Sequence, residues 1–209
     1  LISATVFSNC GFMSLPLAGA LLGDEGVFIV SVHVVVFNLL VWTYGIWVFE
    51  RGAKISPLKA VLTPGMIGII LGLPLFLTGV ELPMVADTVV SGFAALNTPL
   101  AMIVIGSYVA GASFRPQKGD GEVAVSILLR QFGLPLAALG ILILLKIPQG
   151  LLMACMIPIC APAAANTVIF AAKFDGDVEF ASRIMPLGTL LSILTMPVVL
   201  TLANMLSAS

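Results

Sequence analysis

Charged residues are scarce in this sequence. Only 9% of the 209 residues are charged, against about 25% in an ordinary soluble domain, while 60% are hydrophobic. The mean hydropathy is +1.18. No run of basic residues interleaved with aromatic ones is present, so nothing in the sequence indicates a nucleic-acid partner. This composition predicts an all-α integral membrane protein whose surroundings are the lipid bilayer.

Cysteine and histidine are also few. Cys10, Cys155 and Cys160 lie in apolar segments with no CxxC spacing, and His33 is the sole histidine. We therefore expect neither disulfides nor a metal site, and no cofactor. The motifs His-Glu-x-x-His and Gly-x-Ser-x-Gly are missing, which argues against a membrane-embedded hydrolase and against an enzyme. His33 could relay protons, but a packing role is the simpler interpretation.

Seven apolar stretches are each near or above the ~20 residues that a helix needs to cross a bilayer. The predicted spans are residues 1–22, 27–49, 58–78, 87–113, 123–146, 150–174 and 178–205. Basic residues favour cytoplasmic loops, and eight of the nine fall on one face of this arrangement. These eight are Arg51, Lys54, Lys59, Arg115, Lys118, Arg130, Lys173 and Arg183. Residue 1 is thus predicted to be cytoplasmic and Ser209 outside.

The stretch 157–174 is apolar yet interrupted, because Pro158, Pro162, Asn166 and Thr167 fall close together. Proline removes a backbone donor, and broken backbone at membrane depth is tolerated only inside protein or beside a wet cavity. Two half-helices that meet there predict a solute site.

An earlier stretch repeats this design. Residues 8–16 lead through small residues to the acidic turn 23–26 and a long span, as residues 162–167 lead to the acidic turn 175–177 and the last span. The first turn is predicted outside and the second inside, so the copies have opposite topology. Inverted repeats with interrupted helices are typical of transporters.

The residues that carry a family resemblance come from both copies. Asn9-Cys10-Gly11-Phe12-Met13-Ser14-Leu15-Pro16-Leu17 with Leu22-Gly23-Asp24-Glu25-Gly26 resembles the first crossover region of the auxin efflux carrier family in its compact prokaryotic permease form. Asn97-Thr98-Pro99-Leu100-Ala101-Met102 resembles the seventh helix of that family. The segment from Pro162 through Asn166-Thr167 to Asp177 and Ser182-Arg183 resembles its last two helices.

This resemblance implies a fold of ten helices in two inverted five-helix repeats, related to that of bile acid/sodium symporters. Seven helices are then visible, and three are expected before Leu1. Residues 1–49 would end the first repeat, 58–113 would be scaffold helices, and 123–205 would be transport-domain helices. The implied function is secondary transport by elevator-type alternating access, with a small organic anion bound where the fourth and ninth helices cross. The expected location is a prokaryotic inner or plasma membrane, with a homodimer formed through the scaffold helices.

Polar residues beside the breaks are the candidate site. Amides can donate to a carboxylate, so Asn9 and Asn166 are interpreted as substrate ligands, although they could instead join neighbouring helices. Pro16 and Pro162 are the predicted break points, and Asn97 is a further polar position beside a proline. The full set of predicted substrate-binding residues is Asn9, Pro16, Asn97, Pro162, Asn166 and Thr167.

Two arginines lie near predicted cytoplasmic helix ends. Arg130 and Arg183 are long enough to extend to the interface, which is the first interpretation for both. Arg183 could alternatively attract anions at the inner mouth.

Two classes of carrier stay open: an organic-anion permease for a dicarboxylate or an auxin-like carboxylate, and a sodium-coupled symporter of the bile-acid type.

Overall fold

The computed structural model describes residues 7–41, 64–111, 119–164, 166–173 and 176–207. Within these ranges the chain is almost entirely helical and has no strand beyond one isolated bridge. The elements are η1 (Cys10–Ser14), α2 (Leu15–Leu40), α5 (Pro64–Thr78), α6 (Met84–Ala95), α7 (Asn97–Ala110), α8 (Asp120–Leu128), η3 (Leu129–Gly133), α9 (Leu134–Leu144), α10 (Gln149–Cys160), α11 (Asn166–Lys173) and α12 (Val178–Ser207). The predicted all-α class is confirmed.

Among the described residues, four helical stretches are long and apolar enough, by length and composition, to cross a membrane. They are Cys10–Leu40, Met84–Val104, Asp120–Leu144 and Val178–Ser207. The predicted span 178–205 agrees with α12 to within a few residues, and 123–146 agrees with the continuous run from α8 to α9. Five of the basic residues used to orient the chain lie outside the described residues, so the orientation stays a prediction; they are Arg51, Lys54, Lys59, Arg115 and Lys118.

Helix α2 is two arms rather than one rod. Gly23 has φ 63° and ψ −151°, a conformation that only glycine adopts readily. A Cβ added at Gly19 would lie 3.3 Å from the side chain of Val27, whereas residues eight apart in a straight helix are separated by about 12 Å. The chain therefore folds back at the acidic turn, as the two predicted spans 1–22 and 27–49 require.

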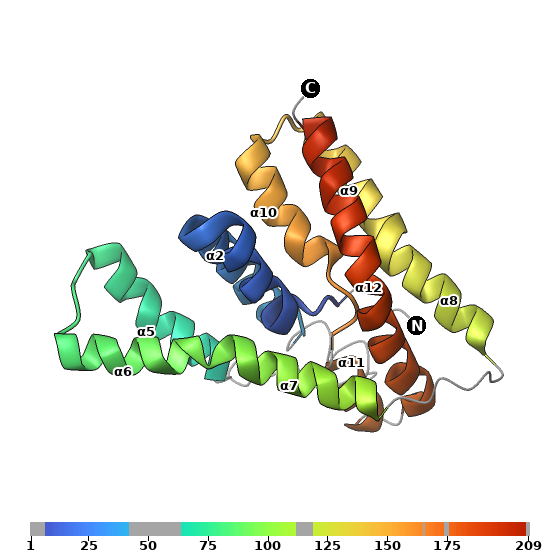
Figure 1. The fold of residues 1–209 in the computed structure, drawn as a ribbon, viewed down its shortest axis with the longest axis horizontal. Coiled ribbons are helices and arrows are strands. Elements are labelled where there is room, and N and C mark those ends of the chain that lie inside the picture. The colour runs from blue at the N-terminus through green and yellow to red at the C-terminus, as the bar shows by residue number, and fades with distance from the viewer. Residues whose placement is uncertain (1–6, 42–63, 112–118, 165, 174–175, 208–209) are drawn as a thin grey trace.

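The folded-back α2 packs against α10, which forms a bundle with α9 and α12 (Figure 1). Its Ala18 and Val30, one from each arm, are fully buried in one apolar cluster. The other helices contribute Leu139, Leu152, Met156, Ile157, Cys160, Met196, Val199, Leu200 and Ala203. This cluster is the main apolar core of the protein's described part.

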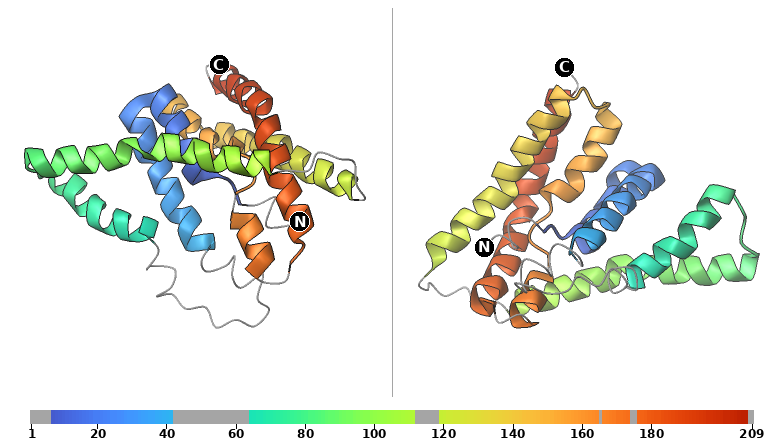
Figure 2. Two further views of the ribbon diagram at one scale, coloured as in Figure 1. Left: turned by 60° about the horizontal axis from the view of Figure 1, so that its bottom comes forward. Right: turned by 180° about the vertical axis from the view of Figure 1, so that it is seen from behind.

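Helices α5 and α6 extend away from that bundle, whereas α7 packs against α12 and η1 (Figures 1 and 2). Helix α6 has no buried residue, and large apolar side chains such as Met84, Val85 and Phe93 are more than 70% exposed. The predicted span 87–113 is found as α6 and α7, joined through the single residue Leu96. An exposed apolar surface of this kind is typical of helices that contact lipid or other membrane helices.

Candidate functional site

The predicted interruption of the sixth span is confirmed. Helix α10 ends at Cys160, the chain is extended at Ala161, with φ −63° and ψ 144°, and α11 begins at Asn166. The cause is local, because a residue that precedes proline is disfavoured in the helical region, and Ala161 precedes Pro162. Pro162 is fully buried, so the broken backbone lies inside the protein.

A second extended segment lies directly against this break. Ser8 forms an antiparallel bridge with Ala163. The Asn9 amide donates to the Pro162 carbonyl at 2.8 Å, and the Ala164 amide donates to the Phe7 carbonyl at 3.0 Å. The two interrupted stretches therefore meet backbone to backbone, although more than 150 residues separate them in the sequence, and each provides hydrogen bonds that the other lacks.

The first break is not at Pro16. Helix continues from Cys10 through η1 into α2, so Pro16 lies inside a continuous helix, directly after the π-helical turn. The non-helical residues are Phe7 to Asn9, and Phe7 makes an edge-to-face contact with Phe37 at 5.9 Å between ring centroids. The prediction of Pro16 as a break point was wrong, because the helix is continuous through Pro16, and the non-helical residues that pair with the second break lie before it.

Arg130 lies at the crossing rather than at the interface. Its side chain is only 5% exposed. The guanidinium donates through Nε to the Ala161 carbonyl at 3.1 Å and through Nη2 to the Ile159 carbonyl at 3.2 Å. These carbonyls belong to the C-terminal end of α10, where helix oxygens have no intrahelical partner. The interpretation of Arg130 as a side chain that extends to the interface was wrong.

Gln131 follows Arg130 in the π-helical turn η3 and connects this turn to α12. Its side-chain amide donates to the Gly188 carbonyl, and its oxygen accepts a 2.7 Å hydrogen bond from the Thr195 hydroxyl. A Cβ at Gly188 would approach the Gln131 side chain to 3.4 Å and Pro162 to 3.8 Å, so the glycine allows close packing here. Single π turns occur frequently at functional sites, and η3 directs adjacent residues to two different helices.

Two of the predicted ligands have buried polar atoms without a hydrogen-bond partner in the part of the chain that the structure describes. They are Nδ2 of Asn9, in a side chain that is 3% exposed, and Oγ1 of Thr167. Such atoms are uncommon in folded proteins and require an explanation. Asn166 begins α11, but its side chain is outside the described set; Asn97 is exposed at the start of α7.

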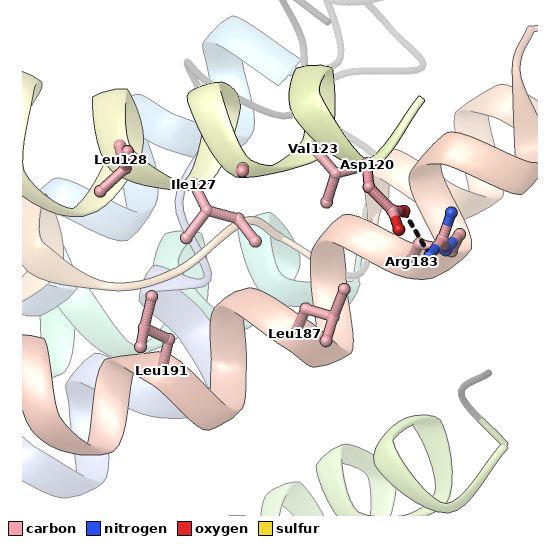
Figure 3. A pocket seen from close by; sticks show the side chains of 8 residues that line it. Asp120, Val123, Ile127, Leu128, Arg183, Leu187 and Leu191 are labelled. Atoms are coloured by element: carbon pink, nitrogen blue, oxygen red, sulfur yellow. Dashed lines mark ion pairs between the residues drawn. The ribbon is translucent and has the colours of Figure 1, made fainter. Parts of the chain in front are cut away.

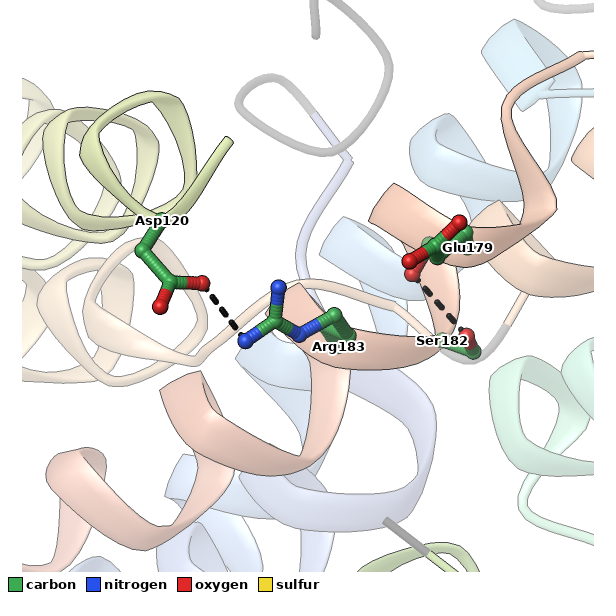
Figure 4. A network of polar contacts seen from close by, with 4 residues as sticks. All are labelled: Asp120, Glu179, Ser182 and Arg183. Atoms are coloured by element: carbon green, nitrogen blue, oxygen red, sulfur yellow. Dashed lines mark hydrogen bonds and ion pairs between the residues drawn. The ribbon is translucent and has the colours of Figure 1, made fainter. Parts of the chain in front are cut away.

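Arg183, on α12, is also buried. It lies beside the N-terminal end of α8, whereas η3 follows the C-terminal end of that helix. Arg183 forms an ion pair with Asp120 at 2.5 Å, and Ser182, also on α12, donates to the carbonyl of Glu179 (Figure 4). A groove of about 500 Å³ starts at this ion pair and runs between α8 and α12 (Figure 3). Its other lining residues are apolar: Val123, Ala124, Ile127, Leu128, Leu187 and Leu191. The carboxylate of Asp120 balances the charge that was predicted to attract anions, which weakens that alternative.

Interrupted helices that cross inside an apolar helical bundle are characteristic of membrane transporters. Within the described ranges, no group of three or more His, Cys, Asp or Glu residues is arranged to hold a metal ion. Backbone ends, an amide, a hydroxyl and an arginine are therefore the chemical groups that the crossing offers.

Comparison with known proteins agrees with this class. The chain belongs to the membrane transport protein family, whose model matches residues 1–57 and 53–200, and this confirms the resemblance to auxin efflux carriers. It is similar to an uncharacterized transporter of Methanothermobacter thermautotrophicus, with 24% identity over 198 residues that cover 93% of this chain. The chain spans 64% of the length of that relative. No solved structure matches.

Proposed function

We propose that this chain forms part of a secondary carrier that moves a small organic anion, such as a dicarboxylate or an auxin-like carboxylate, across the cell membrane. The observation that carries the proposal is the crossing, where two extended segments are paired and the buried Nδ2 of Asn9 and Oγ1 of Thr167 lack partners among the described residues. Both groups can donate to a carboxylate oxygen. A bound anion would supply the missing acceptor.

Electrostatics at the crossing also favours an anion. Helix N-termini carry partial positive charge, and both η1 and α11 begin beside the crossing. Arg130 carries a full positive charge, which exceeds the roughly half negative charge at the C-terminal end of α10 that it contacts through Ile159 and Ala161. The same positive charges would repel a cationic substrate, so a cation is disfavoured.

Alternating access would follow from relative movement of two units. Helices α5, α6 and α7 would form the scaffold, since α5 and α6 expose most of their apolar side chains and α7 contacts the bundle at α12 and η1. The bundle of α2 and α8 to α12, which contains the crossing, would move as the transport domain. A homodimer through the exposed scaffold helices fits the same arrangement.

Uptake by proteoliposomes that contain the intact protein tests this function. We expect saturable uptake of radiolabelled malate or indole-3-acetate, as representatives of the two carboxylate classes, and competition by related carboxylates. Liposomes without protein are the blank, and labelled choline is the matched cationic solute. Saturable uptake of choline without uptake of either carboxylate would contradict the proposal.

A further inference from the structure

The C-terminal end of α10 is an unusual place for a helix to stop. It lies inside the bundle, with Ile157, Pro158, Cys160 and Ala161 all buried. The last carbonyls of a helix have no intrahelical partner and together carry about half a negative charge. Away from water these oxygens need a donor or a cation, because an unsatisfied backbone group costs several kcal/mol in hydrocarbon.

In carriers with discontinuous membrane helices, such unwound carbonyls and half-helix C-terminal ends are the groups that coordinate a coupling Na⁺ or H⁺. Here two of them, the oxygens of Ile159 and Ala161, accept hydrogen bonds from one guanidinium. Arg130 comes from η3, some thirty residues earlier in the chain, so the contact is tertiary rather than a local cap.

We propose that Arg130 is a tethered cation that takes the place of a coupling metal ion at the end of α10, so that this site works without sodium. The inference rests on the proposed function, because coupling has meaning only for a carrier. It favours the organic-anion permease over the sodium-coupled symporter, the alternative that the sequence left open. Arg130 acts here as a positioning residue that stabilises the break beside the substrate groups.

The neighbouring residue keeps this cation in place. Gln131 binds Gly188 and Thr195 on α12, which fixes η3 while Arg130 reaches α10. A guanidinium is planar and offers several donors in a fixed arrangement, so it can bind two carbonyls at once. An ammonium at the same position would offer a compact point charge on a flexible chain instead.

Thermal unfolding of the purified intact protein in detergent tests the proposal without any substrate. We expect the wild-type Tm to be the same in sodium chloride and in choline chloride of equal ionic strength. Arg130→Ala should lower the Tm by about 5–15 °C, since it leaves buried carbonyls without their charged donor. Millimolar methylguanidinium, and to a smaller extent sodium, should restore a large part of that loss, whereas choline should not.

Two further variants separate the charge from packing. Arg130→Lys keeps the charge with a poorer fit, so its Tm should lie between those of the wild type and Arg130→Ala. Gln131→Leu, the adjacent uncharged position, should lower the Tm without any recovery in methylguanidinium or sodium.

Two outcomes would overturn the tethered cation. One is a wild-type Tm that sodium raises in a saturable manner relative to choline, a comparison that does not depend on any variant folding. The other is an Arg130→Ala protein that responds to no cation, like Gln131→Leu. If carboxylate uptake fails while methylguanidinium still restores Arg130→Ala, the proposed anionic substrate is wrong, and the tethered cation holds only for a carrier of another solute.

Discussion

Asn9→Ala in the intact protein is expected to weaken substrate affinity about ten- to a hundredfold. The amide would donate to a charged carboxylate, and hydrogen bonds to charged groups contribute about 1.5–3 kcal/mol, with each 1.4 kcal/mol equal to a tenfold change. Thermal stability should stay the same or rise, because Nδ2 of Asn9 is buried and has no partner among the described residues. The measurement is the substrate dissociation constant by isothermal titration, with the Tm recorded on the same samples.

Asn38→Ala is the matched control. The Asn38 amide already donates to the Val34 carbonyl of its own helix at 3.0 Å, so its removal should leave affinity unchanged. Asn166→Ala should behave like Asn9→Ala if the sequence-based pairing of the two amides is correct. Equal losses of affinity in Asn38→Ala and Asn9→Ala, or normal binding by Asn9→Ala, would favour a role for Asn9 in helix association instead.

The second large effect is expected for Gln131→Leu, which is similar in size but cannot bind Gly188 or Thr195. Interhelical hydrogen bonds in membrane proteins average about 0.6 kcal/mol and reach about 1.7, so the loss of two should cost about 1–3 kcal/mol. For a chain of this length that corresponds to a fall in Tm of about 2–12 °C. Transport should fall with it, because η3 also holds Arg130.

Gln149→Leu provides the comparison. Gln149 likewise connects α10 to α12, through a 2.7 Å bond to Asn204, but this bond is exposed and water can replace it. Its Tm should change much less than that of Gln131→Leu. Equal changes in the two variants would show that burial of the Gln131 network contributes nothing.

The break before α11 could be predicted because its causes are local. Ala161 precedes Pro162, and a residue before proline is disfavoured in the helical region, whereas Pro158 is accommodated inside α10. The fold-back at Gly23 was predictable for the same reason, since a glycine-flanked acidic turn between apolar runs has few alternatives. Both features depend on neighbouring residues only.

The first break could not be placed in the same way. Residues Phe7 to Asn9 contain no proline, and their non-helical conformation is stabilised by hydrogen bonds to Pro162 and Ala164. Only the tertiary arrangement makes that conformation favourable, and Pro16 therefore attracted the prediction instead. Asn9 was nevertheless identified correctly as a buried residue at the crossing, because an amide in an apolar segment needs a partner.

The role of Arg130 was missed, although a signal was present. It lies seven residues inside the predicted span 123–146, about 10 Å along a helix, which is deep for a side chain that must reach the interface. The adjacent Gln131 is a second polar residue at the same depth, and such a pair indicates an interior contact. The sequence did not reveal the acceptors of Arg130, because the carbonyls of Ile159 and Ala161 are free to accept its hydrogen bonds only where α10 ends.

A disulfide between cysteines at positions 8 and 163 tests most directly whether the two interrupted segments meet. The two hydrogen bonds flank the Ser8–Ala163 pair, and in such antiparallel pairs the Cα atoms are about 4.5 Å apart, within the range that a disulfide accepts. The experiment uses Ser8→Cys with Ala163→Cys in a background where Cys10, Cys155 and Cys160 are replaced by alanine. Mass spectrometry after proteolysis measures the yield.

Ser8→Cys with Asn204→Cys is the control pair, because Asn204 contacts Gln149 at the far end of α10, about 16 Å along the helix from Cys160. The expected result is nearly complete cross-linking of positions 8 and 163 under mild oxidation, and none between positions 8 and 204. Failure of positions 8 and 163 to cross-link in folded protein would contradict the crossing, and with it the site proposed for the anion.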